Sequence, residues 1–272
     1  MTVTDSVFGA LGVADVADAT TFVKRVPGAP EGFFAAEAAG LRWLAVDGGA
    51  KVAGVIDVDD DAITLERIER AEPTAQMAEE FGRALATTHD AGAAGFGAKP
   101  DGYDGPCYIG DTTLPMPDSG TRLRWGEFYA AYRVMPYADT ALISGALSRR
   151  AYEDIVDLAQ RLTDGDFDDG FEPSRIHGDL WAGNVLFSSE GAVLIDPAAH
   201  GGHRLTDLAM LALFGMPHLE TIWSAYEEVC FDLPDHWREL IGLHQLHPLL
   251  VHTVLFGGTY GGQAHTVAKA YL

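Results

Sequence analysis

The chain has 272 residues, and 47% of them are hydrophobic, which is enough for one large domain or two closely packed lobes. Its net charge is −22, from 40 acidic and 18 basic residues, so it lacks the basic surface that binding to nucleic acid or to an anionic membrane requires. The two cysteines form no CxxC pair, which fits a reducing compartment. No secretory signal and no membrane-length apolar run is visible, so a cytoplasmic protein is expected.

Residues 1–72 predict a small unit of strands and one helix. Residues 20–26 have the β-branched and aromatic content of a strand. Residues 33–45 fit a helix, because apolar side chains recur there at spacings of three and four. Residues 51–57 and 62–68 fit two strands joined by an acidic turn, so we expect a hairpin.

Residues 73–272 predict a larger helical part. Its first helix opens at Pro73, and residues 95–120 form a long irregular connection rich in Gly, Pro and Asp. Only residues 185–195 interrupt the later helical pattern with a β segment. Helical periodicity is found at 125–134, 148–163, 205–214, 218–231 and 235–255. The sequence therefore predicts an α+β protein, with a small sheet lobe over residues 1–72 and a mainly helical lobe over the rest.

The segment 176–199 brings polar side chains to one end of a hairpin. Its apolar runs 185–187 and 192–195 are short strands joined by a tight turn. Antiparallel pairing puts the start of the first strand beside the end of the second, so Asn184 and Asp196 meet at the open end. An amide oxygen and a carboxylate are hard ligands that suit Mg²⁺.

Asp179 precedes Asn184 by five residues, in the loop that feeds the same end of the hairpin. The pattern H-x-D-x-x-x-x-N, followed by a second Asp after a hairpin, is that of a kinase catalytic loop with its metal-binding Asp. It predicts ATP as the phosphate donor, Asp179 as the base that accepts a hydroxyl proton, and Asn184 and Asp196 as Mg²⁺ ligands. His177 is expected to brace the loop through hydrogen bonds. The competing interpretation is an Asp/Asn pair that only caps turns.

The N-terminal unit supplies the second half of such a site. Lys24 lies in the first strand, and Glu37 lies on the apolar face of the next helix, where an unpaired carboxylate would be costly. An ion pair between them is therefore expected, with Lys24 contacting the ATP phosphates as in kinases. Glu66 and Ile68 end the last strand of the unit, where a kinase hinge offers backbone groups to adenine.

Eight segments carry a family resemblance, from Phe22 to near the C-terminus. They are FVK (22–24), FFAAEAAGLRWL (33–44), CYIGDTTLPMP (107–117), HGDLWAGN (177–184), IDPA (195–198), GHR (202–204), DLAM (207–210) and FGGTY (256–260). Together they resemble the fructosamine kinase family, within the protein-kinase-like and aminoglycoside phosphotransferase superfamily. The Trp of HGDLW distinguishes this family from aminoglycoside and choline kinases.

The resemblance implies a two-lobed protein-kinase-like fold and the phosphorylation of a sugar hydroxyl of ketoamines with ATP and Mg²⁺. It implies a small-molecule partner, a ketoamine or a glycated lysine. The catalytic-loop residues and the Lys–Glu pair would have the roles given above. In addition, Trp181 would lie near the sugar, and Asp207 would be a structural carboxylate that supports the catalytic loop.

The chain departs from the family pattern in three places. Residues 11–21 hold a single glycine, Gly12, where relatives carry a Gly-rich phosphate loop. We therefore expect a truncated sheet lobe and weak ATP binding. Leu205 stands where relatives usually carry Glu, and His200–Gly201 stand where an aromatic pair is common, which leaves the substrate preference open.

Three other functions stay open. A kinase of another aminated small molecule, such as an aminoglycoside, would use the same chemistry. A nucleotide-binding pseudokinase would fit the missing Gly-rich loop, although the complete set of chemistry residues argues against it. A metal-dependent hydrolase built on His177 and Asp179 is disfavoured, because no second metal cluster is visible.

Two further clusters are expected to be structural. The acidic segment 164–170 lacks the Gly and Glu of a calcium-binding loop, so a solvated turn is expected. His244, His247 and His252 lie in an apolar helical stretch without an HExxH motif or a Cys partner, so core or groove histidines are expected.

Overall fold

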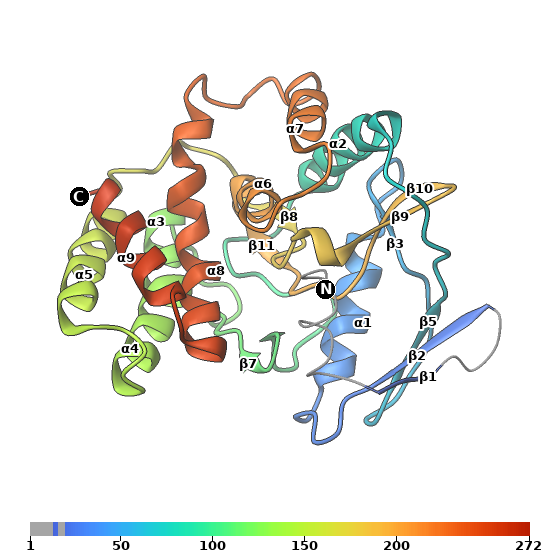
Figure 1. Cartoon of the computed structure of the whole chain (residues 1–272), viewed down its shortest axis with the longest axis horizontal. Helices are drawn as coiled ribbons and strands as arrows, with labels where there is room; N and C mark the ends of the chain where they lie inside the picture. The colour runs from blue at the N-terminus through green and yellow to red at the C-terminus, as the bar shows by residue number, and fades with distance from the viewer. Residues whose placement is uncertain (1–12, 16–19) are drawn as a thin grey trace.

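The structure is a computed structural model that describes residues 13–15 and 20–272. A small antiparallel sheet and helix α1 (Phe33–Leu44) form one lobe, and most of the other helices form a second, larger lobe (Figure 1). The predicted α+β class with a sheet lobe and a helical lobe is confirmed. The division of the chain at residue 72 stays a prediction.

The sheet lobe is a four-stranded antiparallel sheet with the strand order β1-β2-β5-β4. Its strands are β1 (Val13–Asp15), β2 (Thr21–Arg25), β4 (Val55–Val58) and β5 (Ile63–Glu66). Helix α1 packs on this sheet because Phe34 and Leu41 on its apolar face are buried together with Ile63 and Leu65 of β5. The expected hairpin is present as β4 and β5, and the Asp59 carboxylate caps its turn.

Strand β1 is an element that the sequence pattern did not indicate. It pairs with β2 in the register Val13 to Arg25 and Asp15 to Val23, so a β-hairpin leads into Lys24. The expected absence of a Gly-rich loop concerns residues 11–21, of which 11–12 and 16–19 lie outside the described residues. That expectation therefore rests on the sequence alone.

The strand predicted over residues 51–57 is divided in two. Its first part, β3 (Lys51–Val52), leaves the sheet lobe and pairs in parallel with β10 (Gly191–Leu194). Strand β10 also pairs with β9 (Val185–Ser188), which is the predicted hairpin of the catalytic segment. The resulting three-stranded sheet, of order β3-β10-β9, joins a strand that follows α1 to the hairpin of the catalytic segment.

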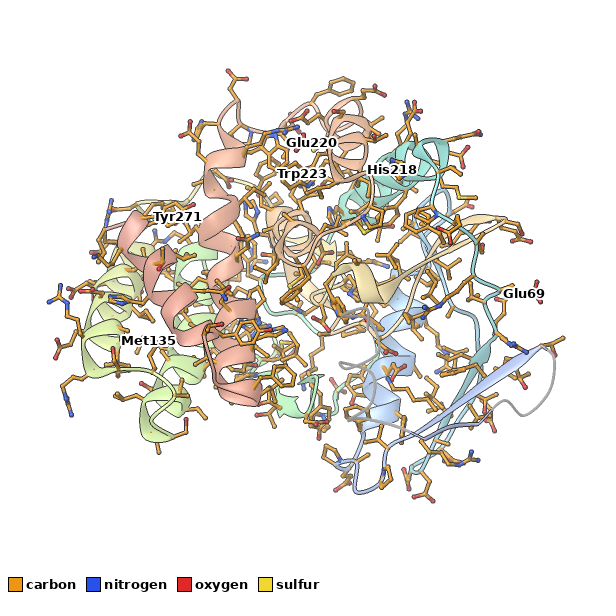
Figure 2. The ribbon with its side chains drawn as sticks, in the orientation of Figure 1. Glu69, Met135, His218, Glu220, Trp223 and Tyr271 are labelled. Atoms are coloured by element: carbon orange, nitrogen blue, oxygen red, sulfur yellow. The ribbon has the colours of Figure 1, made fainter. Side chains whose placement is uncertain are left out.

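The helical lobe begins with α2, whose N-terminus was predicted: the Thr74 hydroxyl accepts the Met77 N–H at 3.2 Å. The helices are α2 (Ala75–Asp90), α3 (Trp125–Phe128), the π-helix η3 (Tyr129–Val134), α4 (Met135–Ile143), α5 (Arg149–Asp164), the 3₁₀ helix η4 (Ala182–Asn184), α6 (Arg204–Leu213), α7 (Leu219–Glu227), the 3₁₀ helix η5 (Trp237–Leu240), α8 (Ile241–Phe256) and α9 (Tyr260–Ala270). Trp223 packs between α7 and α6, where its indole donates to the Leu208 carbonyl (Figure 2). None of the described helices is long and apolar enough to cross a membrane.

Several short elements escaped the sequence analysis. The irregular connection 95–120 contains a hairpin of β6 (Tyr108–Ile109) and β7 (Thr112–Thr113), and β8 (Ser174–Ile176) pairs with β11 (His200–Gly202). Strands of two or three residues are too short to show a period of two, and the β8–β11 pairing is long-range. Helix α9 contains Gly261, whose lack of a side chain lets α9 approach the Ala146 carbonyl closely.

The acidic segment 164–170 is more than a solvated turn. Asp168 accepts hydrogen bonds from the Arg124 side chain and the Gly126 N–H, and Asp169 binds the buried His203 ring. The expectation for the histidines of α8 is confirmed, since His244 and His247 are buried in the core and His252 is partly buried.

Candidate active site

The β9–β10 hairpin places Asn184 and Asp196 at one end. Val185 pairs with Leu194 at the last register position, and the Ile195 N–H donates to the Asn184 carbonyl at 3.1 Å. The residues that flank the two strands are therefore neighbours, as the antiparallel geometry predicts.

Asp179 lies against Asn184. The Asn184 amide nitrogen donates to the Asp179 carbonyl at 2.8 Å and to its carboxylate at 3.1 Å. Desolvation, assisted by the negative charge of Asp196, raises the pKa of Asp179 to about 7. A carboxylate with such a pKa can accept a proton from a hydroxyl near neutral pH. Because the Asn184 nitrogen is occupied, its amide oxygen is the atom left for a further partner.

Lys24 joins the two lobes at this end of the hairpin. Its ammonium lies 2.9 Å from a Glu37 carboxylate oxygen and 2.9 Å from an Asp196 carboxylate oxygen. The expected pair with Glu37 is present, and Asp196 is an additional partner that the sequence did not indicate. Burial by itself would lower the pKa of Lys24, but the two carboxylates raise it above its ordinary value, so the ammonium is charged. The same ammonium lies 5.9 Å from the centre of the Phe33 ring.

Asp196 and Glu37 differ in their ionisation. Although burial opposes ionisation of Asp196, its contact with Lys24 lowers the pKa of Asp196 below the ordinary value. Burial raises the pKa of Glu37 to about 7, and one of its oxygens is buried without a hydrogen-bond partner in the described part of the chain. Asp196 also has a φ of 53°, a left-handed conformation that is uncommon for a non-glycine residue and clusters at functional sites.

His177 braces the catalytic loop. Its Nδ1 accepts the Asp179 N–H at 3.2 Å, so its Nε2 carries the proton that is donated to the Ile195 carbonyl at 2.9 Å. Burial lowers the pKa of His177, which keeps the ring neutral in this arrangement. The His177 ring therefore links Asp179 in the catalytic loop to Ile195, the residue before Asp196. Gly178 next to it has a φ of +81°, and a Cβ there would overlap the Ala198 carbonyl oxygen.

Asp207 holds the loop from the other side. Its carboxylate accepts the N–H groups of His177 and Gly178 at 2.7 and 2.9 Å, and it also binds the His89 ring at 3.1 Å. His89 in turn contacts the Tyr226 hydroxyl at 2.7 Å. Asp207 and His89 are fully buried, so this network fixes the loop rigidly. Sequence analysis missed His89 and Tyr226, because a lone His or Tyr on a helix gives no sequence signal for a long-range hydrogen bond.

Trp181 begins a row of aromatic side chains. Its ring lies 6.0 Å from that of Phe214, which lies 4.9 Å from the His252 ring. His252 is also 5.4 Å from Phe256 and 5.0 Å from Tyr260. Trp181 is two residues beyond Asp179, so this row runs from the catalytic loop to helices α8 and α9.

Glu66 and Ile68 lie at the end of β5 and just beyond it. Ile68 packs against the same apolar cluster as Ile195, the residue before Asp196. The backbone N–H of Glu66 donates to the Gly54 carbonyl at 2.8 Å. An adenine ring bound here could therefore hydrogen-bond to the backbone carbonyl of Glu66 but not to its N–H.

Two of the three residues that depart from the family pattern after Asp196, Leu205 and His200, are structural here. Leu205 is fully buried in the helical core. His200 donates from Nδ1 to the Ala198 carbonyl at 2.7 Å and accepts from the buried Arg133 side chain at 3.4 Å. Burial lowers the pKa of His200 well below its ordinary value, so the ring is neutral. This brace supports the segment that follows Asp196.

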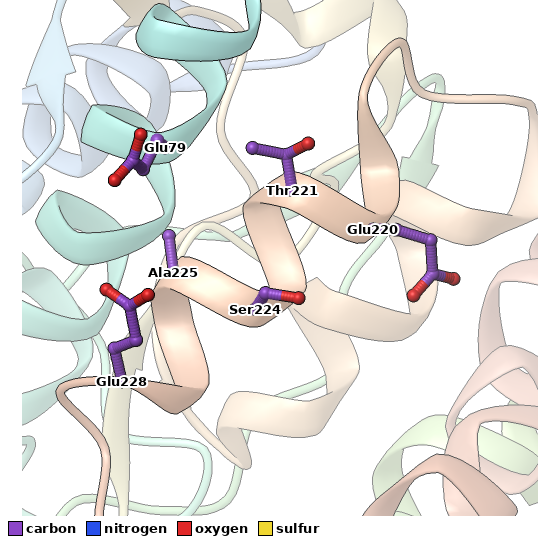
Figure 3. A pocket seen from close by; sticks show the side chains of 6 residues that line it. All are labelled: Glu79, Glu220, Thr221, Ser224, Ala225 and Glu228. Atoms are coloured by element: carbon purple, nitrogen blue, oxygen red, sulfur yellow. The ribbon is translucent and has the colours of Figure 1, made fainter.

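A surface hollow of about 310 Å³ between α2 and α7 contains none of these residues. Figure 3 shows its lining, in which three glutamates gather. Two of them, Glu79 and Glu228, are already paired with Arg83. We assign no chemistry to this hollow.

Comparison with known proteins gives the family. The fructosamine kinase family profile matches residues 10–272. A probable ketoamine kinase of Enterococcus faecium is 30% identical over 258 residues, which cover 92% of this chain and 87% of that protein. A probable ketoamine kinase of Thermus thermophilus is 31% identical over 243 residues, which cover 88% and 83%.

Solved structures agree. The crystal structure of a candidate fructosamine-3-kinase from Thermobifida fusca is 45% identical and superimposes with a TM-score of 0.84, covering 92% of this chain and 85% of that one. The aminoglycoside phosphotransferase APH(2″)-IIa, solved with streptomycin and ATP, is 11% identical with a TM-score of 0.62 over 96% of this chain and 88% of that one, a likeness of fold alone. The chain therefore belongs to the fructosamine kinase family, a family of small-molecule kinases.

Proposed function

We propose that this protein transfers the γ-phosphoryl group of ATP, with Mg²⁺, to a sugar hydroxyl of a ketoamine such as a glycated lysine. The observation that carries the proposal is the Asp179 carboxylate, whose pKa of about 7 fits a base at neutral pH. It is held 3.1 Å from Asn184, in the loop that His177 and Asp207 fix. Membership of the fructosamine kinase family supports the choice of acceptor.

Asp179 is the group that accepts the proton of the attacking hydroxyl. The oxygen of that hydroxyl forms the new bond to phosphorus as the bond from phosphorus to the β-phosphate oxygen breaks. The hydrogen bond from Asn184 orients the Asp179 carboxylate. Trp181, two residues further on, offers a flat apolar surface to the sugar ring.

The residues at the hairpin end fit a magnesium ion. The Asn184 amide oxygen and the Asp196 carboxylate are hard oxygen donors, and Mg²⁺ typically takes one or two protein ligands with phosphates and water. The described residues contain no group of three His, Cys, Asp or Glu that could form a protein cage for a metal, which agrees with a site that relies on phosphate oxygens. When bound, the ion would neutralise charge on the transferred phosphate.

Lys24 is the cation that we assign to the nucleotide phosphates. Its contacts with Glu37 and Asp196 hold the ammonium at the hairpin end, and its charge is secured by both carboxylates. The backbone at Glu66 and Ile68 would receive the adenine, next to Ile195. In this proposal residues 1–72 bind nucleotide, and residues 73–272 carry the base and the acceptor.

The test is an ATP-consumption assay across ketoamines, aminoglycosides and choline, with ³¹P NMR to locate the phosphate on the product. Magnesium-dependent turnover of a ketoamine is the expected result. If the protein phosphorylated aminoglycosides and no ketoamine, the proposed acceptor would be wrong, but the assignment of ATP-dependent phosphoryl transfer would stand. Nucleotide binding without turnover of any acceptor would identify a pseudokinase and overturn the proposal.

A further inference from the structure

The backbone around Asp196 is held from both sides by histidine rings. His177 donates from Nε2 to the carbonyl of Ile195, directly before Asp196, at 2.9 Å. His200 donates from Nδ1 to the carbonyl of Ala198, two residues after Asp196, at 2.7 Å. Asp196 itself has a φ of 53°, and a non-glycine residue keeps such a conformation only where its surroundings enforce it. The two rings supply hydrogen bonds on both sides of the strained residue.

The two rings are opposite tautomers, and each is fixed by a donor at its other nitrogen. The Nδ1 of His177 accepts the Asp179 N–H at 3.2 Å, and the Nε2 of His200 accepts from the Nε of Arg133 at 3.4 Å. An arginine side chain can only donate, so the single proton of the His200 ring must lie on Nδ1, which faces Ala198. Burial and the charge of Arg133 lower the pKa of His200 well below its ordinary value, so the ring does not gain a second proton.

Arg133 is a buried cation with neutral neighbours. It lies in the π-helix η3, a kind of element that is frequent at functional sites, and is 2% exposed. Its Nη1 donates to the carbonyls of Pro115 and Tyr132 at 2.7 and 2.9 Å, and the guanidinium lies 4.6 Å from the centre of the Phe128 ring. None of its hydrogen-bond partners in the described part of the chain is a carboxylate. Burial lowers the pKa of Arg133 to about 10, so the group is charged at neutral pH and remains a donor to His200.

The segment that receives the His200 hydrogen bond lies between the catalytic loop and helix α1. A Cβ on Gly178 would overlap the Ala198 carbonyl oxygen, so this carbonyl lies directly against the catalytic loop. On the α1 side, a Cβ on Gly40 would be 3.1 Å from the side chains of both Pro197 and Ala199. A displacement of Ala198 would therefore disturb the contacts that the segment after Asp196 makes with both neighbours.

We propose that His200, fixed by Arg133, is a positioning residue that keeps Asp196 in its metal-binding orientation through the Ala198 carbonyl. The inference rests on the proposed function, in which Asp196 binds Mg²⁺, and it gives a role to a residue outside the motifs of the catalytic loop. Relatives commonly carry an aromatic pair at residues 200–201, and Phe and Tyr have no N–H at the place of Nδ1. The hydrogen bond to Ala198 therefore distinguishes this chain from such relatives.

The experiment separates the two hydrogen bonds of His200. In His200→Asn the amide nitrogen takes the place of Nδ1 and keeps the donor to Ala198, whereas Arg133 loses its acceptor. In His200→Gln the amide reaches the place of Nε2 and keeps the acceptor for Arg133, whereas Ala198 loses its donor. Each variant lacks one buried hydrogen bond, so both should lose similar stability in urea unfolding. The two variants are therefore matched controls for each other.

The measured quantity is the factor by which Mg²⁺ tightens the binding of AMP-PNP, a non-hydrolysable ATP analogue. Calorimetry with MgCl₂ and with EDTA gives the two Kd values. With His200→Gln we expect this factor to fall roughly 3- to 10-fold, the scale of one neutral hydrogen bond, and the Kd in EDTA to stay unchanged. His200→Asn should keep the wild-type factor. His200→Phe is a second variant without the donor and should show the same fall as His200→Gln.

A factor that is equal in the Asn and Gln variants, or that falls in the Asn variant alone, overturns the inference. If His200→Gln does not fold, a wild-type factor in His200→Phe overturns it instead. The measurement needs no acceptor, so it is independent of which substrate is phosphorylated. If Mg²⁺ tightens AMP-PNP binding but no acceptor is turned over, the proposed function fails and the variants still decide the role of His200. If Mg²⁺ has no effect on the wild-type protein, the assignment of Asp196 to the metal fails and the inference is overturned with it.

Discussion

The ammonium of Lys24 lies 2.9 Å from carboxylate oxygens of both Glu37 and Asp196, and so one side chain ties helix α1 to the end of the catalytic hairpin. Glu37 comes from the sheet lobe, whereas Asp196 follows β10 in the segment that runs on into the helical lobe. The contact makes the position of α1 depend on the same residue that we assign to the metal. The contact with Lys24 keeps Asp196 ionised, whereas at Glu37 burial outweighs the same contact and raises the pKa.

Asp179→Asn should lower phosphoryl transfer by roughly 10²–10⁴-fold, the usual scale for removal of a general base. Folding should be intact, because an amide fits the same space and can still contact Asn184. The measurement is kcat with saturating ATP and ketoamine, together with a thermal melt. Turnover close to that of the wild type would remove Asp179 from the role of base.

The pH dependence of the reaction should follow the same carboxylate. A base acts only when deprotonated, so kcat/KM should fall as the pH drops through about 7, the raised pKa of Asp179, and reach a plateau above it. Glu37 has a similar pKa, and Glu37→Gln separates the two contributions. A rate that stays flat from pH 5 to pH 8 in both proteins would contradict the assignment.

Much of this site could be predicted because its geometry is local. Asn184 and Asp196 meet through a hairpin of ten residues, and the position of Glu37 on an apolar helix face required a partner. The contacts that sequence analysis missed are long-range: Asp196 is 172 residues from Lys24, and His89 is 118 residues from Asp207. The partner of strand β3 also escaped, because its pairing with β10 is decided by the meeting of two lobes and not by its own two residues.

Asp196→Ala should abolish Mg²⁺-dependent nucleotide binding, because it removes the carboxylate that we assign as the principal metal ligand. It also removes one of the two anionic partners of Lys24. Calorimetry of ATP binding with and without Mg²⁺ measures the effect, and Asp157→Ala on the outer face of α5 is the control. Unchanged metal dependence in the Asp196 variant would exclude this residue from the site.

Asp207→Ala should destabilise the fold as well as the reaction. It leaves the buried N–H groups of His177 and Gly178 without an acceptor and His89 without its partner, at a cost of about 3–5 kcal/mol in the free energy of unfolding. Urea unfolding is the measurement. Asp90→Ala is the control, because Asp90 is exposed and its pair with Arg204 should contribute less than about 1 kcal/mol. Equal effects of the two substitutions would show that the Asp207 network is not a structural support.

The last prediction concerns ATP affinity and the sequence of residues 11–21, which holds only one glycine. A Gly-rich loop closes backbone N–H groups over the β- and γ-phosphates, and without it these contacts fall to Lys24 and the metal. The loss of two or three hydrogen bonds to charged oxygens, at about 1.5–3 kcal/mol each, would weaken ATP binding by roughly two orders of magnitude or more. The catalytic loop is unaffected, so we expect a high KM for ATP with a measurable kcat. Since β1 and β2 form a hairpin here, a double substitution of Ala17→Gly and Ala19→Gly in the connection between them should lower that KM with little change in kcat. Micromolar ATP binding by the wild-type protein would show that another segment replaces the glycines, and tight binding without turnover would favour a pseudokinase.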